Sequence, residues 1–128
     1  MGYTTTFEGR VAITPPLSKA EIEYLQKFNK TRRMKRLCGP YYVDGTGDLG
    51  QGKDPDITGY NTPPDGQPGL WCQWQPSDDG LYIEWDGGEK FYEPQHWMKY
   101  LIDHFIGNTP LAQEELPFFT GHILQWET

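Results

Sequence analysis

Five carboxylates lie close together in one stretch of the chain, and carboxylates are side chains that hold divalent cations or exchange protons. Glu84, Asp86 and Glu89 lie along and just after one predicted strand, and Asp78 and Asp79 occupy the turn before it. Glu84 and Asp86 share one face of that strand, because side chains alternate with a period of two. The stretch lacks the Asp-x-Asp-x-Asp-Gly spacing of a calcium loop. We therefore interpret it as a solvated outer strand with turn-forming aspartates.

Histidine and cysteine, the other common ligands and nucleophiles, are too scattered to define a site. His96 and His104 are eight residues apart on one predicted helix and point in directions roughly 80° apart, and His122 lies on a different element. Cys72 alternates with large strand residues and is expected to be a small core side chain, whereas Cys38, beside a basic run, is the better reactive thiol. Neither has a second cysteine two to four residues away. We predict no metal site, no cofactor and no catalytic set.

The most distinctive charge feature is a basic run that follows the first predicted helix. Five of the eleven lysines and arginines fall within seven residues: Lys30, Arg32, Arg33, Lys35 and Arg36. With Tyr41 and Tyr42 nearby, these cations form a candidate site for a phosphate group, a nucleotide or an acidic partner surface. The alternative is a helix end whose cations are balanced by the protein's own carboxylates. Residues 45–50 spell Gly-x-Gly-x-x-Gly but lack the strand and helix that give this motif its phosphate geometry.

The composition limits the class of protein. A chain of 128 residues suits one domain with a modest core, and aromatic residues, 15% of the sequence, supply much of its apolar area. The net charge of −7 argues against nonspecific binding of nucleic acid. The sequence has no apolar run of the ~20 residues that cross a bilayer and no secretory signal at its start. We therefore expect a cytoplasmic protein with reduced cysteines and no membrane association.

Hydrophobic periodicity predicts six elements and one long loop. In chain order the elements are a strand over 3–13, a helix that begins at Ser18, the two strands of a hairpin over 70–75 and 81–86, a helix over 94–106 and a strand over 118–126. Ser18 with Glu21 forms a capping box, and Leu17 with Ile22 forms a hydrophobic staple. Residues 39–69, rich in Gly and Pro, are predicted to be irregular. This order indicates the α+β, ferredoxin-like (split βαβ) fold, with two helices on one face of a four-stranded antiparallel sheet.

In this fold the helices cover one face of the sheet, yet aromatic residues fall on both faces of the hairpin. If Trp74 and Trp85 point toward the helices, then Trp71, Tyr82 and Glu84 lie on the opposite face. The acidic residues on that face would repel phosphate, so a protein or the long loop is expected to cover it. The predicted protein-binding surface consists of Trp71, Tyr82, Glu84, Tyr41, Tyr42 and Tyr60.

Four segments carry a resemblance to known proteins. They are Leu-Trp-Cys-Gln-Trp at 70–74, Ile-Glu-Trp-Asp-Gly-Gly-Glu-Lys-Phe-Tyr at 83–92, Trp-Met-Lys-Tyr-Leu-Ile-Asp-His-Phe at 97–105 and Thr-Gly-His-Ile-Leu-Gln-Trp at 120–126. Through them, most of the chain outside the long loop is similar to a family of small uncharacterised bacterial and phage proteins. The family has no established activity, so the resemblance implies no catalytic residues.

These observations favour a non-enzymatic protein-binding or accessory module. It would act through the aromatic sheet face and the long loop, on another protein or on a second copy of itself. Two alternatives stay open. One is a small binder or enzyme for a phosphate or nucleotide ligand, which would use the basic run over residues 30–36. The other is an acidic inhibitor that mimics nucleic acid in conflict between phage and host.

Overall fold

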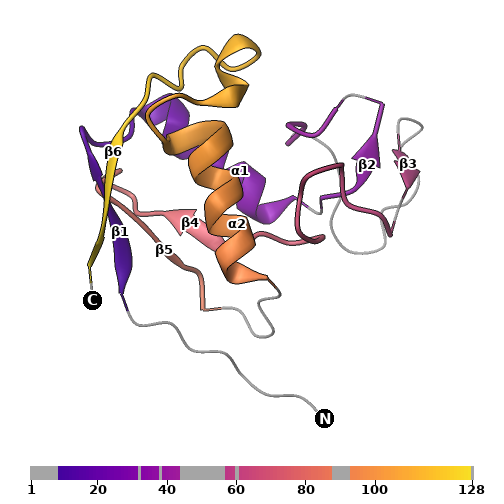
Figure 1. Ribbon diagram of the computed structural model, residues 1–128, viewed down its shortest axis with the longest axis horizontal. Helices are drawn as coiled ribbons and strands as arrows, with labels where there is room; N and C mark the ends of the chain where they lie inside the picture. The colour runs from indigo at the N-terminus through magenta and orange to yellow at the C-terminus, as the bar shows by residue number, and fades with distance from the viewer. Residues whose placement is uncertain are drawn as a thin grey trace.

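Four strands form one antiparallel sheet with the order β4-β5-β1-β6 (Figure 1). They are β1 (Arg10–Thr14), β4 (Trp74–Pro76), β5 (Tyr82–Trp85) and β6 (Ile123–Glu127). The structure is a computed structural model that describes residues 9–31, 33–37, 39–43, 57–59, 61–87 and 93–127. Within these residues the sheet is joined by helices α1 (Lys19–Lys30) and α2 (Pro94–Leu101). The predicted α+β class, with two helices and four antiparallel strands, is confirmed.

The register of the sheet defines one buried face and one open face. Val11 pairs with Ile83, and Trp74 pairs with Trp85, so these four side chains share a face. They pack in one hydrophobic cluster with residues of α1 and α2, so the helices cover this face. Trp74 and Trp85 therefore point toward the helices, which is the condition on which the predicted placement of Tyr82 depends. Tyr82, the neighbour of Ile83, therefore lies on the face away from the helices.

The predicted hairpin is present, and its turn packs against Leu17, just before the first residue of α1. Gly80 has a φ of 75°, and a Cβ at this position would lie 2.6 Å from the carbonyl oxygen of Leu17, so only glycine fits. The strands are shorter than predicted: β4 begins at Trp74 rather than at residue 70, and β6 begins at Ile123 rather than at residue 118. β1 begins at Arg10, and the earlier part of its predicted range lies outside the described residues, except for Gly9.

Helix α1 begins as the sequence predicts. The Ser18 N–H donates to Glu21 Oε1 (2.8 Å), and the Glu21 N–H donates to Ser18 Oγ (3.2 Å), which completes the capping box. Leu25 and Phe28 are buried, whereas Ile22, a member of the predicted hydrophobic staple, is half-buried. The helix therefore presents its apolar face to the core with its first turn fixed by side-chain hydrogen bonds.

Glu21 also forms a buried pair with His122, at the start of β6. The Nε2 atom of His122 lies 2.7 Å from Glu21 Oε2, and the two side chains are 1% and 2% exposed. His122 Nδ1 lies 2.7 Å from the carbonyl oxygen of Pro15. Because a carbonyl oxygen only accepts, Nδ1 carries a hydrogen, and Nε2 and the carboxylate share another. This pair ties the first turn of α1 to β6.

Helix α2 continues into a π-helical segment, η1 (Ile102–Ile106), so the predicted helix over 94–106 is confirmed in extent. Trp97, Leu101 and Phe105 are buried, and Phe28 of α1 meets Trp97 and Phe105 edge-on at ring-centroid distances of 5.9 and 5.1 Å. Tyr100 of the same helix is also buried. A short 3₁₀ helix, η2 (Leu111–Glu114), precedes β6. Aromatic contacts between α1 and α2 therefore form the centre of the core.

A second, two-stranded sheet joins the basic run to the predicted irregular loop. Strand β2 (Lys35–Arg36) pairs antiparallel with β3 (Ile57–Gly59). This pairing corrects the prediction for residues 39–69, which contain a short strand. Three-residue strands have too little periodicity to be recognised in a sequence rich in Gly and Pro.

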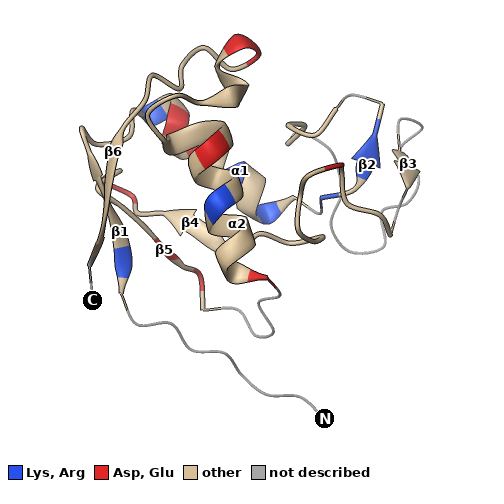
Figure 2. Ribbon diagram, in the orientation of Figure 1, with Lys and Arg blue, Asp and Glu red and all other residues tan. Residues whose placement is uncertain are grey.

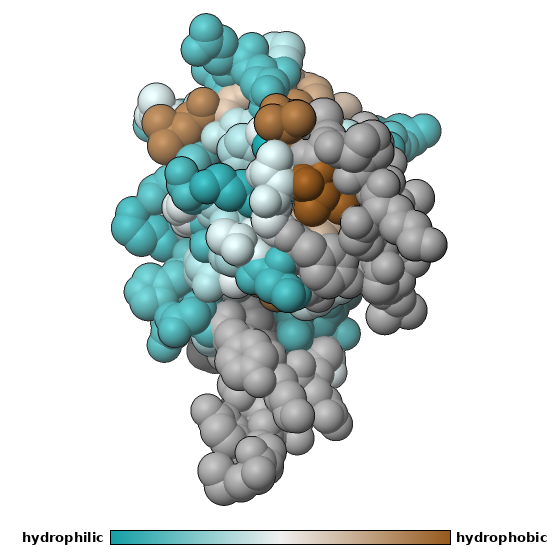
Figure 3. All heavy atoms as spheres, turned by 90° about the vertical axis from the view of Figure 1, so that its right-hand side faces the viewer, coloured by the Kyte–Doolittle hydropathy of each residue, from teal (hydrophilic) through white to brown (hydrophobic). Residues whose placement is uncertain are grey.

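The described surface carries charges of both signs. Lys19 and Glu23 on α1, and Lys99 of α2 with Asp103 of η1, form ion pairs at helical spacing, and Figure 2 shows mixed charges along both helices. The side of the molecule toward β2 and β3 is largely hydrophilic, with separate hydrophobic spots (Figure 3). Among the described residues, none of the helices has both the length and the apolar character needed to span a bilayer.

Candidate functional site

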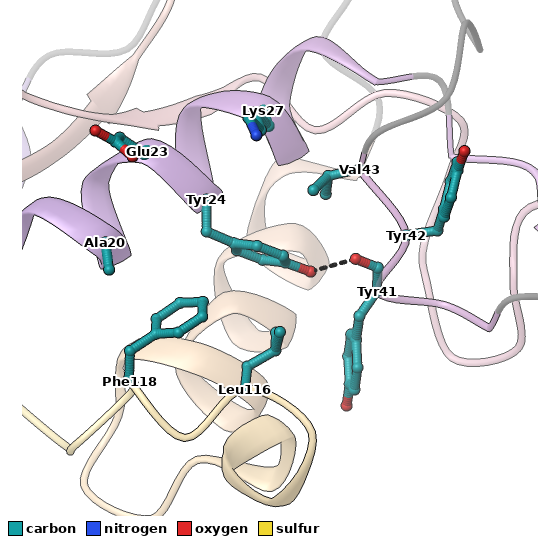
Figure 4. A pocket seen from close by; sticks show the side chains of 9 residues that line it. All are labelled: Ala20, Glu23, Tyr24, Lys27, Tyr41, Tyr42, Val43, Leu116 and Phe118. Carbon is teal, nitrogen blue, oxygen red and sulfur yellow. Dashed lines mark hydrogen bonds between the residues drawn. The ribbon is translucent and has the colours of Figure 1, made fainter.

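An open hollow of about 340 Å³ lies between α1 and two irregular segments (Figure 4). We call it the tyrosine hollow. It is lined by Ala20, Glu23, Tyr24, Lys27, Tyr41, Tyr42, Val43, Leu116 and Phe118. Tyr41 and Tyr42 belong to the predicted protein-binding surface, and the structure brings them here rather than to the sheet face.

The lining of the tyrosine hollow is mainly apolar with a few polar groups. The rings of Tyr24 and Phe118 pack with centroids 5.9 Å apart, and Leu116 and Val43 pack partly buried against the core. Glu23 and Lys27, one turn apart on α1, are exposed and add one charge of each sign. This combination of an apolar wall and a few polar groups is typical of sites that take an apolar group and orient it.

One wall of the hollow belongs to the segment over residues 40–43, which is held by side chains rather than by regular structure. Each of its four carbonyl oxygens accepts a hydrogen bond: from Gln67 Nε2 at Pro40 (2.8 Å), from Tyr24 Oη at Tyr41 (2.6 Å), from Arg33 Nη2 at Tyr42 and from Thr31 Oγ1 at Val43 (3.2 Å). A buried carbonyl without a partner costs about 1–3 kcal/mol. These donors therefore fix the wall before any partner binds.

Arg33 is central to this wall and is not an open anion-binding residue. Its side chain is buried, with the residue 2% exposed, and its guanidinium lies 4.3 Å from the centroid of the Phe28 ring. Nη1 also approaches the carbonyl oxygen of Pro40 at 3.5 Å. Burial lowers the pKa of Arg33 to about 10, so it stays charged at neutral pH. The predicted anion patch therefore loses Arg33, because its donors are directed at the chain's own carbonyls.

Tyr41 is fixed at its side chain as well as at its carbonyl. Its Oη lies 2.6 Å from His104 Nδ1. The imidazole of His104 stacks on Tyr100, with ring centroids 3.9 Å apart and planes at 19°. Gln67 Nε2, which bonds Pro40, also donates to Tyr100 Oη at 3.0 Å. The 40–43 segment is thus connected to α2 and η1 through a continuous set of ring and amide contacts.

Burial keeps the rings of this set uncharged near neutral pH. It raises the pKa of Tyr24 and of Tyr41, raises that of Tyr100 to about 12, and lowers the pKa of His104. Tyr24 therefore stays a hydrogen-bond donor, and Tyr41 and His104 meet as neutral groups. The arrangement is suited to supporting a wall of the hollow.

The open face of the sheet carries Tyr82 and Glu84, as predicted, but it is largely polar. The Arg10 guanidinium carbon lies 3.5 Å from the centroid of the Tyr82 ring, and Glu84 pairs with Gln75 of β4. Trp71 is half-buried in the segment before β4, where no strand pairing assigns it to a face. The described part of this face therefore offers little free aromatic surface. Tyr60 lies outside the described residues.

The other members of the basic run are dispersed. Lys30 is exposed at the last residue of α1, and Arg32 lies outside the described residues. Lys35 and Arg36 line a smaller hollow of about 170 Å³ with Gly39, Pro40, Pro64 and Asp65. The Lys35 ammonium is 3.8 Å from the Asp65 carboxylate. The structure thus brings only Lys35 and Arg36 together at one described concavity.

The remaining candidates for chemistry do not form a site in the described part of the chain. Cys72 is fully buried, which raises the pKa of its thiol to about 12 and keeps it protonated. Asp86 accepts a hydrogen bond from Asn29 Nδ2 at 3.1 Å. No three His, Cys, Asp or Glu residues among those described could together hold a metal ion. Cys38 and Glu89 lie outside the described residues.

Several residues of the hollow escaped the sequence prediction. Tyr24 lies four residues before Phe28, a helical spacing that could have placed it on the buried face. Leu116 follows an irregular segment and carried no periodic signal, and Phe118 was assigned to the predicted strand over 118–126, although β6 begins only at Ile123. Thr31 and Gln67 bond carbonyls distant in the chain, which no local pattern reveals.

Comparison with known proteins gives no assignment for this geometry. No protein-family model, curated protein or solved structure matches the chain. The functional conclusion therefore rests on the contacts of the tyrosine hollow.

Proposed function

We propose that this chain is a non-enzymatic protein-binding module whose contact site is the tyrosine hollow. The observation that carries the proposal is an open, mainly apolar hollow of about 340 Å³ with one wall already fixed by four side-chain donors. Its volume is at the lower end of the range for small-molecule sites, roughly 300–1,000 Å³. It is thus suited to one apolar side chain of a partner protein.

The fixed wall favours binding over catalysis. Ordering a loop when a partner arrives reduces affinity, so a wall held in advance removes part of that cost. The groups that could exchange protons beside the hollow, Tyr24, Tyr41 and His104, bond one another or the wall. We therefore assign them a supporting role.

We also propose that the chain has a ferredoxin-like fold, is cytoplasmic and belongs to a phage-related setting. Numbered among themselves, the four sheet strands lie in the order second, third, first, fourth, and this order supports a ferredoxin-like arrangement. The free, buried Cys72 is compatible with a reducing cytoplasm. The resemblance to small bacterial and phage proteins adds a phage-related setting and no activity.

Replacing Ala20 tests the proposal with little risk to the fold, because this residue is exposed and lines the hollow. Ala20→Trp should fill the hollow, and Gln95→Trp, at an exposed position of α2, is the matched control. Affinity capture from cells with quantitative mass spectrometry should lose the specific partners of wild type only in Ala20→Trp. If Trp71→Ala with Tyr82→Ala loses them instead, the sheet face is the contact site and the hollow is not.

A second candidate function, binding of a phosphate-bearing ligand, is favoured by one observation. Lys35 and Arg36 share a hollow of about 170 Å³. Asp65 at the same hollow counts against an anion. A thermal-shift screen with inorganic phosphate and nucleotides checks this alternative: a rise in Tm that Lys35→Ala removes would support it, and no rise would exclude it.

A further inference from the structure

Strand β6 is an edge of the four-stranded sheet, and its outer side has no partner strand among the described residues. The sheet order ends at β6, which Figure 1 places at the margin of the ribbon. On its inner side β6 pairs with β1 through five consecutive residues, from Ile123 opposite Thr14 to Glu127 opposite Arg10, with no bulge. An edge of this length exposes a row of unpaired N–H and C=O groups.

The ladder identifies which groups are unpaired. The Ile13 N–H donates to Leu81 beside β5 (2.8 Å), so the backbone of Ile13, and of Val11 two residues earlier, is directed toward β5. In an antiparallel ladder the residue opposite such a position also directs its N–H and C=O away. Leu124 lies opposite Ile13, and Trp126 lies opposite Val11. The backbone groups of Leu124 and Trp126 are therefore directed to the open edge.

The side chains of β6 do not protect this edge. Natural edge strands are commonly blunted by lysine, proline or a bulge, and the sequence Ile-Leu-Gln-Trp-Glu has none of these. Ile123 is 72% exposed and Trp126 is 49% exposed, on opposite faces of the strand. Leu124 shares a face with Trp126 and is half-buried. The edge thus combines free backbone groups with exposed apolar side chains.

We propose that β6 pairs antiparallel with β6 of a second copy of this chain, in a register centred on Gln125. This register places Leu124 of each copy opposite Trp126 of the other, so all the free backbone groups of these residues are paired. It also places an aliphatic side chain beside an exposed indole twice, a favourable cross-strand pair. Ile123 falls opposite position 127 of the other copy.

A second copy is the occupant because the edge is complementary to itself. A two-fold axis through Gln125 satisfies both copies with the same residues, as an isologous interface requires. The dimer would contain one continuous eight-stranded sheet, in which the β6 edge of each copy is covered by β6 of the other. This inference is independent of the tyrosine hollow, and Ala20→Trp should leave the association unchanged.

A charge-exchange experiment tests both the dimer and its register. Gln125 is exposed, and in the proposed dimer each copy places it opposite itself. Gln125→Lys and Gln125→Glu should each weaken self-association several-fold in sedimentation equilibrium, because like charges directly opposite are destabilising. An equimolar mixture of the two variants should restore association. Gln95→Lys and Gln95→Glu, at an exposed position of α2, are the controls.

Three results would overturn the inference. The first is a wild-type chain that stays monomeric at every concentration at which it is soluble. The second is a dimer that both Gln125 variants leave unchanged. The third is a monomer whose Leu124 and Trp126 amides are nevertheless protected from hydrogen exchange, which would mean that another segment or molecule covers β6.

Discussion

The two ends of α1 each bury a charged side chain, and they do so in different ways. In its first turn, Glu21 meets His122, the residue before β6, at 2.7 Å. Just past its last turn, Arg33 contacts Phe28 and the carbonyls of the 40–43 segment, with no carboxylate among its described partners. One end pairs a buried carboxylate with an imidazole that hydrogen-bonds it, and the other surrounds a buried guanidinium with backbone carbonyls.

This difference follows from the backbone around each end. A helix and a strand have their own backbone hydrogen bonds. At the first end, the pair of Glu21 and His122 therefore adds a link between α1 and the start of β6, which form without it. An irregular segment has no such ladder, and its carbonyls need side-chain donors. At the second end, Arg33, Tyr24, Thr31 and Gln67 provide them. The irregular wall of the hollow therefore depends on individual side chains.

Removal of the imidazole at the first end should have the largest effect. His122→Ala leaves the Glu21 carboxylate buried without its partner, which typically costs about 3–5 kcal/mol. The measurement is the free energy of unfolding in urea. His96→Ala, whose pair with Glu93 is largely exposed, is the control and should change stability by under about 1 kcal/mol. Equal losses in the two variants would contradict the importance of the buried pair.

Alkaline pH should reduce stability through the contacts at the second end of α1, where Gln67 links Tyr100 to the 40–43 segment. Burial raises the pKa of Tyr100 to about 12, against about 10 in an unfolded chain. Its contribution is therefore complete below pH 10 and is lost as the pH rises toward 12, by up to about 2–3 kcal/mol. Arg33, with its pKa lowered to about 10, opposes part of this loss.

Tyr100→Phe separates the contribution of this phenol from the rest. The variant should show a flatter fall in unfolding free energy between pH 10 and 12 than wild type, measured by urea unfolding at each pH. An unchanged slope would mean that Tyr100 ionises as readily in the fold as in water.

Arg33→Met should have a smaller effect on stability and a local effect on the wall. It removes the hydrogen bond from Arg33 to the Tyr42 carbonyl, at a cost of about 1–3 kcal/mol, while Gln67 still bonds Pro40. Amide hydrogen exchange at Tyr41 and Val43 should accelerate more than exchange in β1. Lys30→Met, at an exposed cation, is the matched control. A uniform acceleration across the chain would argue against a local role.

The smallest effect is expected on the open sheet face. Arg10 stacks over Tyr82 at 3.5 Å, and an exposed contact of this kind contributes about 0.5–1 kcal/mol. Arg10→Ala should therefore shift the urea midpoint only slightly. A loss of unfolding free energy as large as that in His122→Ala would contradict this expectation. It would show that the contact between Arg10 and Tyr82 contributes as much as the buried pair.

The sequence allowed the regular elements to be predicted and left the site largely hidden. The capping box at Ser18, the hairpin around the turn at Gly80 and the helix over 94–106 follow from local spacing, and each is present. The predicted strands were longer than the observed ones. The sequence does not show where pairing with the neighbouring strand begins. Arg33 shows why the site was missed: a cation in a basic run has the same local pattern whether it meets solvent or the carbonyls of a distant loop.

The most direct test of the tyrosine hollow uses a small apolar probe on the intact chain. In ¹⁵N-resolved NMR, titration with N-acetylphenylalanine amide should cause saturable shifts at the amides of Ala20, Val43 and Phe118. The same titration of the Ala20→Trp variant should leave the amide signals of Val43 and Phe118 in place. Absence of saturable shifts in wild type, or equal shifts in the filled variant, would contradict a preformed site for an apolar side chain.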